Sequence, residues 1–338
     1  MSAQLTILRA GPGLTVQDMG RPGYLDMGLS RGGAVDRLAL AEGAALLGQP
    51  DSLAAVEMAG MGGEFQADQD LRIALTGARM RAQIDGATAV WNASHLLPAG
   101  ARLSIGPAVA GSYGYLSIGG GVKGDPLLGA CSAHLTAGIG ALLKAGDRLA
   151  IGPDAGGATG MTFDPEDRFS GGEIRIVASF QTDLFAGDVL ERLQATAFRR
   201  DARANRMGVR LESGGPGFHV SGGRSVLSET IVPGDIQVTG DGTPFVLLAE
   251  CQTTGGYPRI GTVLPRDLPK VAQAPAGADL RFRFVSLDEA VSAERAAAQA
   301  RAALPRALRP LIRDPRNMSD LLSYQLISGA IAREEDVL

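Results

Sequence analysis

The stretch PAGARLSI at residues 98–105 places a glycine turn directly before an alternating strand, and the same pattern recurs along the chain. The other copies are KAGDRLAI at 144–151, VPGDIQV at 232–238 and PAGADLRF at 275–282. Glycine reaches positive φ without steric cost, and the Leu/Ile alternation that follows is typical of a half-buried strand. The sequence therefore predicts a mainly β protein with many tight turns.

Corresponding copies in the two halves lie roughly 130 residues apart, which indicates an internal duplication. Helical patterns are few, at 34–47, 183–193, 288–304 and 318–331, so closed antiparallel barrels are favoured over a doubly wound sheet. We expect two β-barrel domains joined by a Gly-rich linker and followed by a helical tail. The predicted bounds are 1–155 for the first barrel, 156–169 for the linker, 170–287 for the second barrel and 288–338 for the tail.

Composition narrows the class of partner. The 338 residues carry a net charge of −4, so a nucleic-acid partner is not expected. No apolar run reaches ~18 residues, and the first residues lack a signal-peptide pattern, so neither a membrane span nor export is expected. The two cysteines, Cys131 and Cys251, form no disulfide framework. The expected location is the cytoplasm.

Short catalytic motifs are weak. Gly28-Leu29-Ser30-Arg31-Gly32 matches a nucleophile elbow, but the three histidines lie in no motif, so a turn that enters a helix is the simpler interpretation. No phosphate-binding P-loop occurs, and we expect another chain to bind any ATP that is used. Cys131-x-x-His134 is a single pair, too few ligands for structural zinc, so no metal site is predicted.

Two polar clusters next to glycines are the best candidates for a binding site. One covers residues 15–24 and the other 250–259. A solvated hairpin is the simpler alternative for the second cluster. If the duplicated halves meet, both clusters can converge on one ligand in the cleft between domains. The predicted substrate-binding residues are Gln17, Arg21, Ser30, Arg206, Gln237, Gln252, Thr254, Gly256, Tyr257 and Gln273.

Side-chain chemistry suggests a role for each group. Arginines 21, 206 and 259 can hold a carboxylate or a developing oxyanion through two parallel donors, and we expect a catalytic role for Arg259. Glutamines 237, 252 and 273 can orient an amide, since their side chains both donate and accept. Asp36 and Asp267 are candidate acid/base groups, although a helix-capping or turn role suits each equally.

Several motifs resemble one family. The segments at 17–24, 28–36, 205–211, 233–238 and 252–258, with Asp267-Leu268 and Ala272-Gln273, are similar to signatures of the biotin-dependent carboxyltransferase subdomain A/B family. Its members have also been called allophanate hydrolase subunit 2, and they include the C subunit of 5-oxoprolinase. The resemblance runs from about residue 7 to residue 284. It implies two cyclophilin-like β-barrels and a separate partner protein of the carboxyltransferase subdomain C/D type, which is the B subunit in 5-oxoprolinase.

The resemblance also implies a function. In 5-oxoprolinase, the A, B and C subunits together hydrolyse 5-oxoproline to glutamate with ATP and Mg. We therefore expect a component of a hydrolase that acts on a cyclic amide, with no cofactor bound by this chain alone. One alternative is a urea carboxylase-like carboxyltransferase with biotin on another chain. The others are a non-catalytic regulatory binding partner of a B-type subunit and a stand-alone serine hydrolase that uses Ser30.

The chain departs from the family pattern at residues 129–133. The family often has Gly-Ser-Arg-Ser-Thr where this chain has Gly-Ala-Cys-Ser-Ala, and a following Gly-Arg segment is shortened. One or two arginines that could hold a carboxylate are therefore missing.

Overall fold

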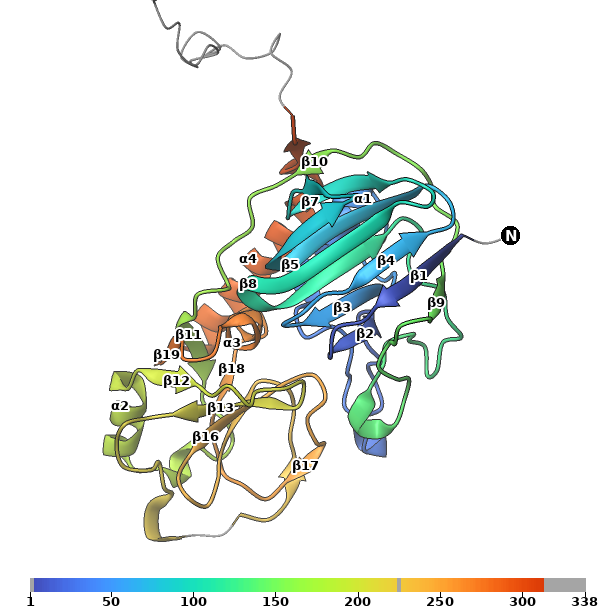
Figure 1. Cartoon of the computed structure of the whole chain (residues 1–338). Helices are drawn as coiled ribbons and strands as arrows, with labels where there is room; N and C mark the ends of the chain where they lie inside the picture. The colour runs from blue at the N-terminus through green and yellow to red at the C-terminus, as the bar shows by residue number, and fades with distance from the viewer. Residues whose placement is uncertain (1–2, 224–225, 313–338) are drawn as a thin grey trace, which may run out of the picture.

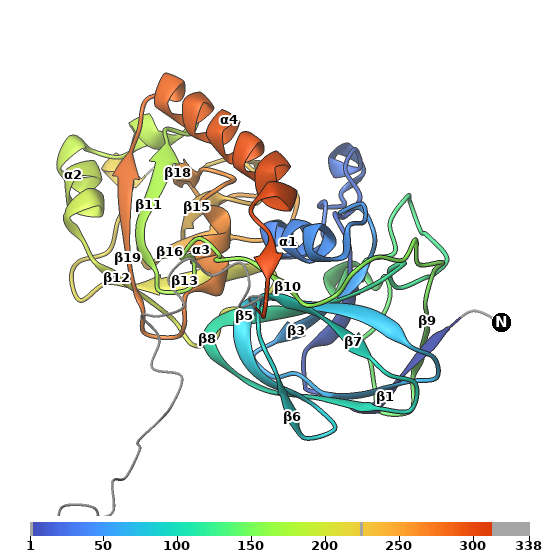
Figure 2. The same ribbon diagram turned by 90° about the horizontal axis from the view of Figure 1, so that it is seen from above.

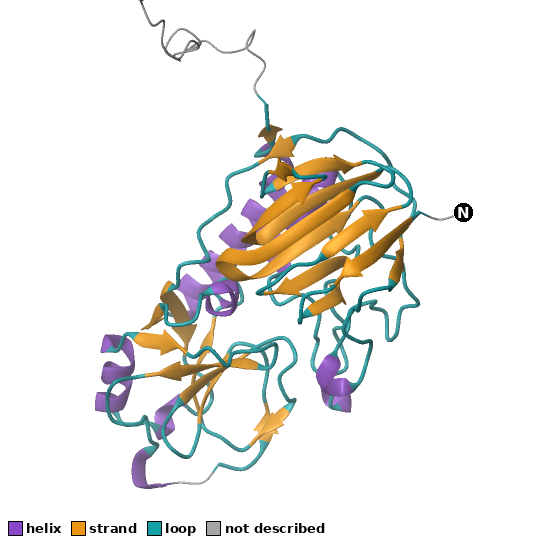
Figure 3. Cartoon of the chain, viewed as in Figure 1, coloured by secondary structure: helices purple, strands orange, loops and turns teal. Residues whose placement is uncertain are grey.

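The chain forms two β-rich halves that lie side by side, with helices at their junction (Figure 1). The structure is a computed structural model that describes residues 3–223 and 226–312. Strands dominate both halves, and helices are few (Figure 3). The predicted mainly β architecture is confirmed.

The N-terminal half is built on one eleven-stranded sheet, in which a central path runs in the order β20-β10-β7-β5-β8-β4-β1-β9. Its strands are β1 (Gln4–Arg9), β2 (Leu14–Gln17), β3 (Ala55–Ala59), β4 (Glu64–Ala67), β5 (Leu71–Ile84), β6 (Ala87–Ala89), β7 (Ala93–Leu97), β8 (Arg102–Ile118), β9 (Arg148–Ala150), β10 (Met161–Thr162) and β20 (Arg309–Pro310). The long β5–β8 pair changes register three times between Gly77 and Ala82. Such irregularities bend a sheet and increase its twist.

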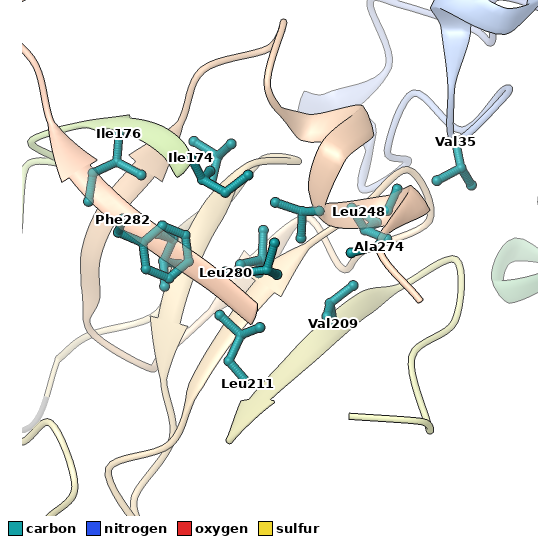
Figure 4. Packing of buried hydrophobic residues seen from close by; sticks show 14 of the residues in the cluster. Val35, Ile174, Ile176, Val209, Leu211, Leu248, Ala274, Leu280 and Phe282 are labelled. Carbon is teal, nitrogen blue, oxygen red and sulfur yellow. The ribbon is translucent and has the colours of Figure 1, made fainter. Parts of the chain in front are cut away.

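The C-terminal half is a closed barrel with the strand order β11-β18-β15-β16-β13-β12-β19. These strands are β11 (Gly172–Val177), β12 (Phe198–Arg200), β13 (Gly208–Glu212), β15 (Asp235–Val238), β16 (Pro244–Leu247), β18 (Arg259–Val263) and β19 (Asp279–Phe284). Parallel pairing of β11 with β19 closes the ring. Its core is packed with aliphatic and aromatic side chains (Figure 4), and the ring centroids of Phe198 and Phe282 lie 5.4 Å apart.

The four glycine turns that suggested the fold have the expected geometry. Gly100, Gly146, Gly234 and Gly277 all have positive φ, between 79° and 100°. They are followed by β8, β9, β15 and β19 respectively. A side chain at these positions would be strained, which explains why glycine opens each turn.

The helices agree with the sequence pattern except in detail. Two regular helices, α1 (Arg37–Leu47) and α4 (Leu287–Ala303), fall where predicted, and α4 spans from the barrel to α1 (Figure 2). The helix predicted at 183–193 is divided into η3 (Thr182–Leu184) and α2 (Gly187–Ala195). A short helix, α3 (Leu268–Gln273), was not expected. The helix predicted at 318–331 lies outside the described residues.

The predicted linker and tail are more integrated than expected. Within the linker, β10 pairs with β7 and with β20, so both segments extend the N-terminal sheet. After α4 the chain forms η5 (Leu304–Arg306) and then β20, so the described part of the tail is not wholly helical.

Candidate functional site

The loop that follows the N-terminal polar cluster lies against the start of the C-terminal cluster where the halves meet. The Gly32 amide donates to the Ala249 carbonyl at 3.1 Å. A side chain at Gly28 would lie 3.9 Å from the Thr253 hydroxyl. The loop that carries η1 (Leu25–Met27) and the short strand β17 (Thr254–Gly255) point to the same side of the molecule (Figure 1). The structure therefore brings residues 28–32, which follow the N-terminal cluster, next to the start of the C-terminal one.

Gln17 and Arg21 are buried against the segment that departs from the family pattern. The Gln17 amide nitrogen donates to the Ala133 carbonyl at 3.2 Å, and Arg21 Nη2 donates to the Ser132 carbonyl at 2.5 Å. Asp18 fixes the same segment by accepting from the Cys131 amide at 2.6 Å. These contacts hold residues 131–133 against three polar side chains.

Three polar atoms in this cluster have no hydrogen-bond partner within the described part of the chain. They are Gln17 Oε1, Arg21 Nη1 and Ser132 Oγ, on side chains that are at most 1% exposed. Buried polar groups are normally paired, since leaving one unpaired costs about 1–3 kcal/mol. Such a group therefore indicates either an enclosed water or a place where a ligand binds.

Ser30 contacts a histidine that the sequence motifs did not connect to it. Ser30 Oγ lies 2.8 Å from His134 Nε2, and both side chains are buried. The Ala137 amide donates both to the His134 carbonyl at 3.1 Å and to His134 Nδ1 at 3.3 Å; with Nδ1 as an acceptor, the neutral ring carries its proton on Nε2 and donates it to Ser30. Burial lowers the pKa of His134, although Glu250 opposes this shift. A serine nucleophile needs the opposite arrangement, in which Nε2 accepts the hydroxyl proton.

Arg206 connects the two halves through two buried carboxylates. Its guanidinium contacts Glu57 of the N-terminal sheet and donates to Glu250 at 2.6 Å and to the Gly33 carbonyl at 2.6 Å. Glu250 also accepts from the amide and hydroxyl of Thr136, both at 3.2 Å. Burial works against the charge of Arg206, but Glu57 and Glu250 raise its pKa above the ordinary value. Arg206 is therefore an ion-paired bridge with no free fork for a ligand.

A second buried network continues from Glu57 into the junction. The Tyr115 hydroxyl donates to Glu57 at 2.6 Å and accepts from the Asp36 amide at 2.9 Å. Arg168, from the predicted linker, donates to Asp36 at 2.7 Å and holds Glu42 with two bonds of 2.9 and 2.6 Å. One arginine neutralises only one of the two carboxylates, and burial raises the pKa of Glu42 to about 7.

Asp36, Gln273 and Asp267 have structural partners for their side chains. Asp36 caps α1 by accepting from the Ala39 amide at 3.2 Å. The Gln273 oxygen accepts from the backbone amides of Ser112 and Tyr113. Its nitrogen donates to Asp36 at 2.8 Å and to the Tyr113 carbonyl at 2.9 Å. Asp267 is bound on both oxygens by Arg175, at 2.7 Å each, and these bonds help to lower its pKa against the effect of burial. None of the three lies in the Gln17–Arg21 cluster.

The remaining predicted residues form a separate group on the barrel. Arg259 donates to Glu229 at 2.5 Å and to the carbonyl of Thr230 at 3.1 Å, and its backbone amide donates to Gln181 at 2.9 Å. Gln237 packs so closely under Gly255 that a side chain there would lie 2.4 Å from its Nε2 atom. Four predicted residues line the exposed rim of this group, namely Gln252, Thr254, Gly256 and Tyr257.

Several residues of the junction could not be singled out from the sequence. His134 is visible there only as half of a possible metal pair, and Glu57, Tyr115 and Arg168 lie in no catalytic motif. Within residues 3–223 and 226–312, no group of three or more His, Cys, Asp or Glu side chains could hold a metal ion. In the same residues, no helix is long and apolar enough to cross a membrane.

The chain thus has two β-rich halves that share a polar junction, and comparison with known proteins shows the family to which it belongs. The chain belongs to the family described as carboxyltransferase domain, subdomain A and B, which it matches over residues 27–284. It is 36% identical over 295 residues to the 5-oxoprolinase C subunit of Escherichia coli (strain K12), covering 86% of this chain and 94% of that protein.

Solved structures share the fold. The crystal structure of TTHA0988 matches with a TM-score of 0.76 at 32% identity, covering 84% of this chain but only 56% of that chain. The urea carboxylase of Kluyveromyces lactis matches with a TM-score of 0.78 at 22% identity, over 93% of this chain and 31% of that one. At that identity the second likeness concerns the fold alone.

Proposed function

We propose that this chain is the C subunit of an ATP-dependent 5-oxoprolinase, which hydrolyses 5-oxoproline to glutamate together with the A and B subunits. The observation that carries the proposal is the 36% identity to a protein named as the C subunit of 5-oxoprolinase, extending over 94% of that protein. The substrate is a cyclic amide with a carboxylate. ATP with Mg is used by the complex in the cytoplasm, and this chain binds no cofactor by itself.

The geometry of the junction is compatible with this role. The Gln17–Arg21 cluster offers buried donors and an acceptor, which suits a polar small molecule better than an apolar one. The Ser30–His134 pair has its proton on the wrong nitrogen for a serine nucleophile, so a stand-alone serine hydrolase has less support. The alternative function, carboxyl transfer from biotin, is supported only by a shared fold.

Complex formation tests membership of the enzyme. The chain is co-expressed with the A-type and B-type subunits, purified through a tag on the B-type partner and analysed by size exclusion. We expect one peak that contains all the chains at micromolar concentration. Separate peaks would contradict the proposal. A complex that forms without turning over 5-oxoproline would instead support the regulatory alternative.

A further inference from the structure

We infer that Gln17 Oε1, Arg21 Nη1 and Ser132 Oγ together form a subsite for a cis amide, the group in which an N–H and a C=O point the same way. This inference rests on the proposed function only for the identity of the ligand. The subsite itself follows from the unpartnered buried atoms at residues 17, 21 and 132.

The side chains of Gln17 and Arg21 contact one short segment of backbone, which also carries Ser132. Gln17 and Arg21 bind the successive carbonyls of Ala133 and Ser132, at 3.2 and 2.5 Å, so both side chains lie against the same dipeptide. A side chain at Gly32 would lie 3.6 Å from Arg21 Nη1 and 2.9 Å from the His134 ring. The free guanidinium nitrogen therefore lies near the Ser30–His134 pair, in packing that leaves no room for a side chain at Gly32.

The hydrogen-bond character of the atoms selects the ligand. The amide nitrogen of Gln17 donates to Thr15 at 3.0 Å and to Ala133, which fixes its oxygen as a free acceptor. Arg21 Nη1 can only donate, and the Ser132 hydroxyl can do either. A carboxylate satisfies the arginine but repels the glutamine oxygen. A lactam satisfies both, because its N–H meets Gln17 and its C=O meets Arg21 and Ser132.

Entry requires movement of one surface turn. Residues 127–130 form a tight hairpin, in which the Leu127 amide donates to the Ala130 carbonyl at 3.0 Å and Leu128 and Gly129 both have positive φ. The Leu127 carbonyl lies over Arg21, 3.4 Å from Nε. Leu128 has a φ of 54°, which is unfavourable for a residue with a side chain, so displacing the turn relieves strain.

Binding measurements without ATP test the subsite. Three probes are titrated into the chain and into its complex with the partner chains: 5-oxoproline, 2-pyrrolidinone and N-methyl-2-pyrrolidone. We expect the first two to bind and the N-methyl compound, which lacks the N–H, to bind about tenfold more weakly. Gln17→Met and Arg21→Met should each weaken 2-pyrrolidinone binding by about tenfold or more. Arg192→Met is the matched control, since Arg192 likewise donates to two backbone carbonyls but lies on the barrel surface.

The outcomes separate this inference from the proposed function. Equal binding of the N-methyl compound, no binding of any probe, or unchanged affinity in folded Gln17 and Arg21 variants would show that the atoms hold only an enclosed water. If the complex nevertheless hydrolyses 5-oxoproline, the function stands and the subsite is wrong. Gln17-dependent lactam binding without turnover would support the subsite and contradict the function. Gln17→Leu, which is close to glutamine in size and removes the acceptor without adding a charge, gives a second variant if Gln17→Met does not fold.

Discussion

Replacing Arg206 by methionine removes the ion-paired bridge between the halves and leaves Glu57 and Glu250 without their cation. Both carboxylates are at most 2% exposed, and breaking a buried pair by removing one partner costs about 3–5 kcal/mol. Methionine keeps much of the aliphatic stem, so little of the loss comes from packing. We therefore expect the free energy of unfolding to fall by about 3–5 kcal/mol at pH 7.

The control is Arg210→Met, in the strand β13 that follows Arg206. The Arg210 side chain is 36% exposed, and its nearest carboxylate oxygen, on Asp201, is 3.3 Å away, so the loss should stay below about 1 kcal/mol. Unfolding in urea is followed by circular dichroism and by the fluorescence of Trp91, the only tryptophan. Equal losses for Arg206→Met and Arg210→Met would refute the bridge.

The pH dependence gives a second readout for Arg206→Met. Burial alone would raise the pKa of Glu250, but Arg206 lowers it below the ordinary value in the native protein. The stability that this pair contributes is therefore present at neutral pH and is lost as the pH falls through the depressed pKa. In the variant, protonation relieves the isolated Glu250 carboxylate, so the difference in the free energy of unfolding between native protein and variant should narrow from pH 7 to pH 5. A difference that widens would contradict this reasoning.

Three further predictions follow from the junction. Burial raises the pKa of Glu42 to about 7, so the stability that it contributes is present below its ordinary pKa and is lost as the pH rises through 7. Glu42→Gln should therefore flatten the dependence of the free energy of unfolding on pH around pH 7, measured in urea. An unchanged slope would contradict this prediction. Tyr115→Phe removes a bond to a charged acceptor and should lower the free energy of unfolding by about 1.5–3 kcal/mol in the same assay, so a loss under about 0.5 kcal/mol would count against it. Ser30→Ala should reduce turnover of the complex by less than about tenfold, and a fluorophosphonate probe should not label Ser30; labelling would revive the serine-hydrolase hypothesis.

Local patterns predicted much of the fold because they depend on neighbouring residues. A glycine with positive φ followed by alternating Leu and Ile specifies a turn and a strand, as at Gly100 and Gly234. The presence of α1 was also predicted, although the helix begins at Arg37 and not at residue 34, because Asp36 is its N-cap. The integration of the linker could not be predicted, because the pairing of β10 with β20 joins residues almost 150 positions apart.

The candidate site was predicted less completely, for a related reason. Gln17 and Arg21 could be selected because polar residues next to glycines often line sites. Their environment depends on long-range contacts with residues 132–134, which no local pattern encodes. Arg168 lies in a stretch of charged residues that is typical of a solvated surface, yet it is buried between Asp36 and Glu42. In both places the long-range contacts, and not the local sequence, decide whether a polar side chain lines a candidate site or forms a buried ion pair.

The release of glutamate from 5-oxoproline tests the central claim most directly. The chain is combined with the A-type and B-type subunits, 5-oxoproline, ATP and Mg, and glutamate is measured over time. We predict glutamate release that requires ATP and all the chains and that stops when this chain is omitted. Avidin, which sequesters biotin, should not affect the release. Release that continues without this chain, or a complete mixture that forms a complex but yields no glutamate, would contradict the assignment.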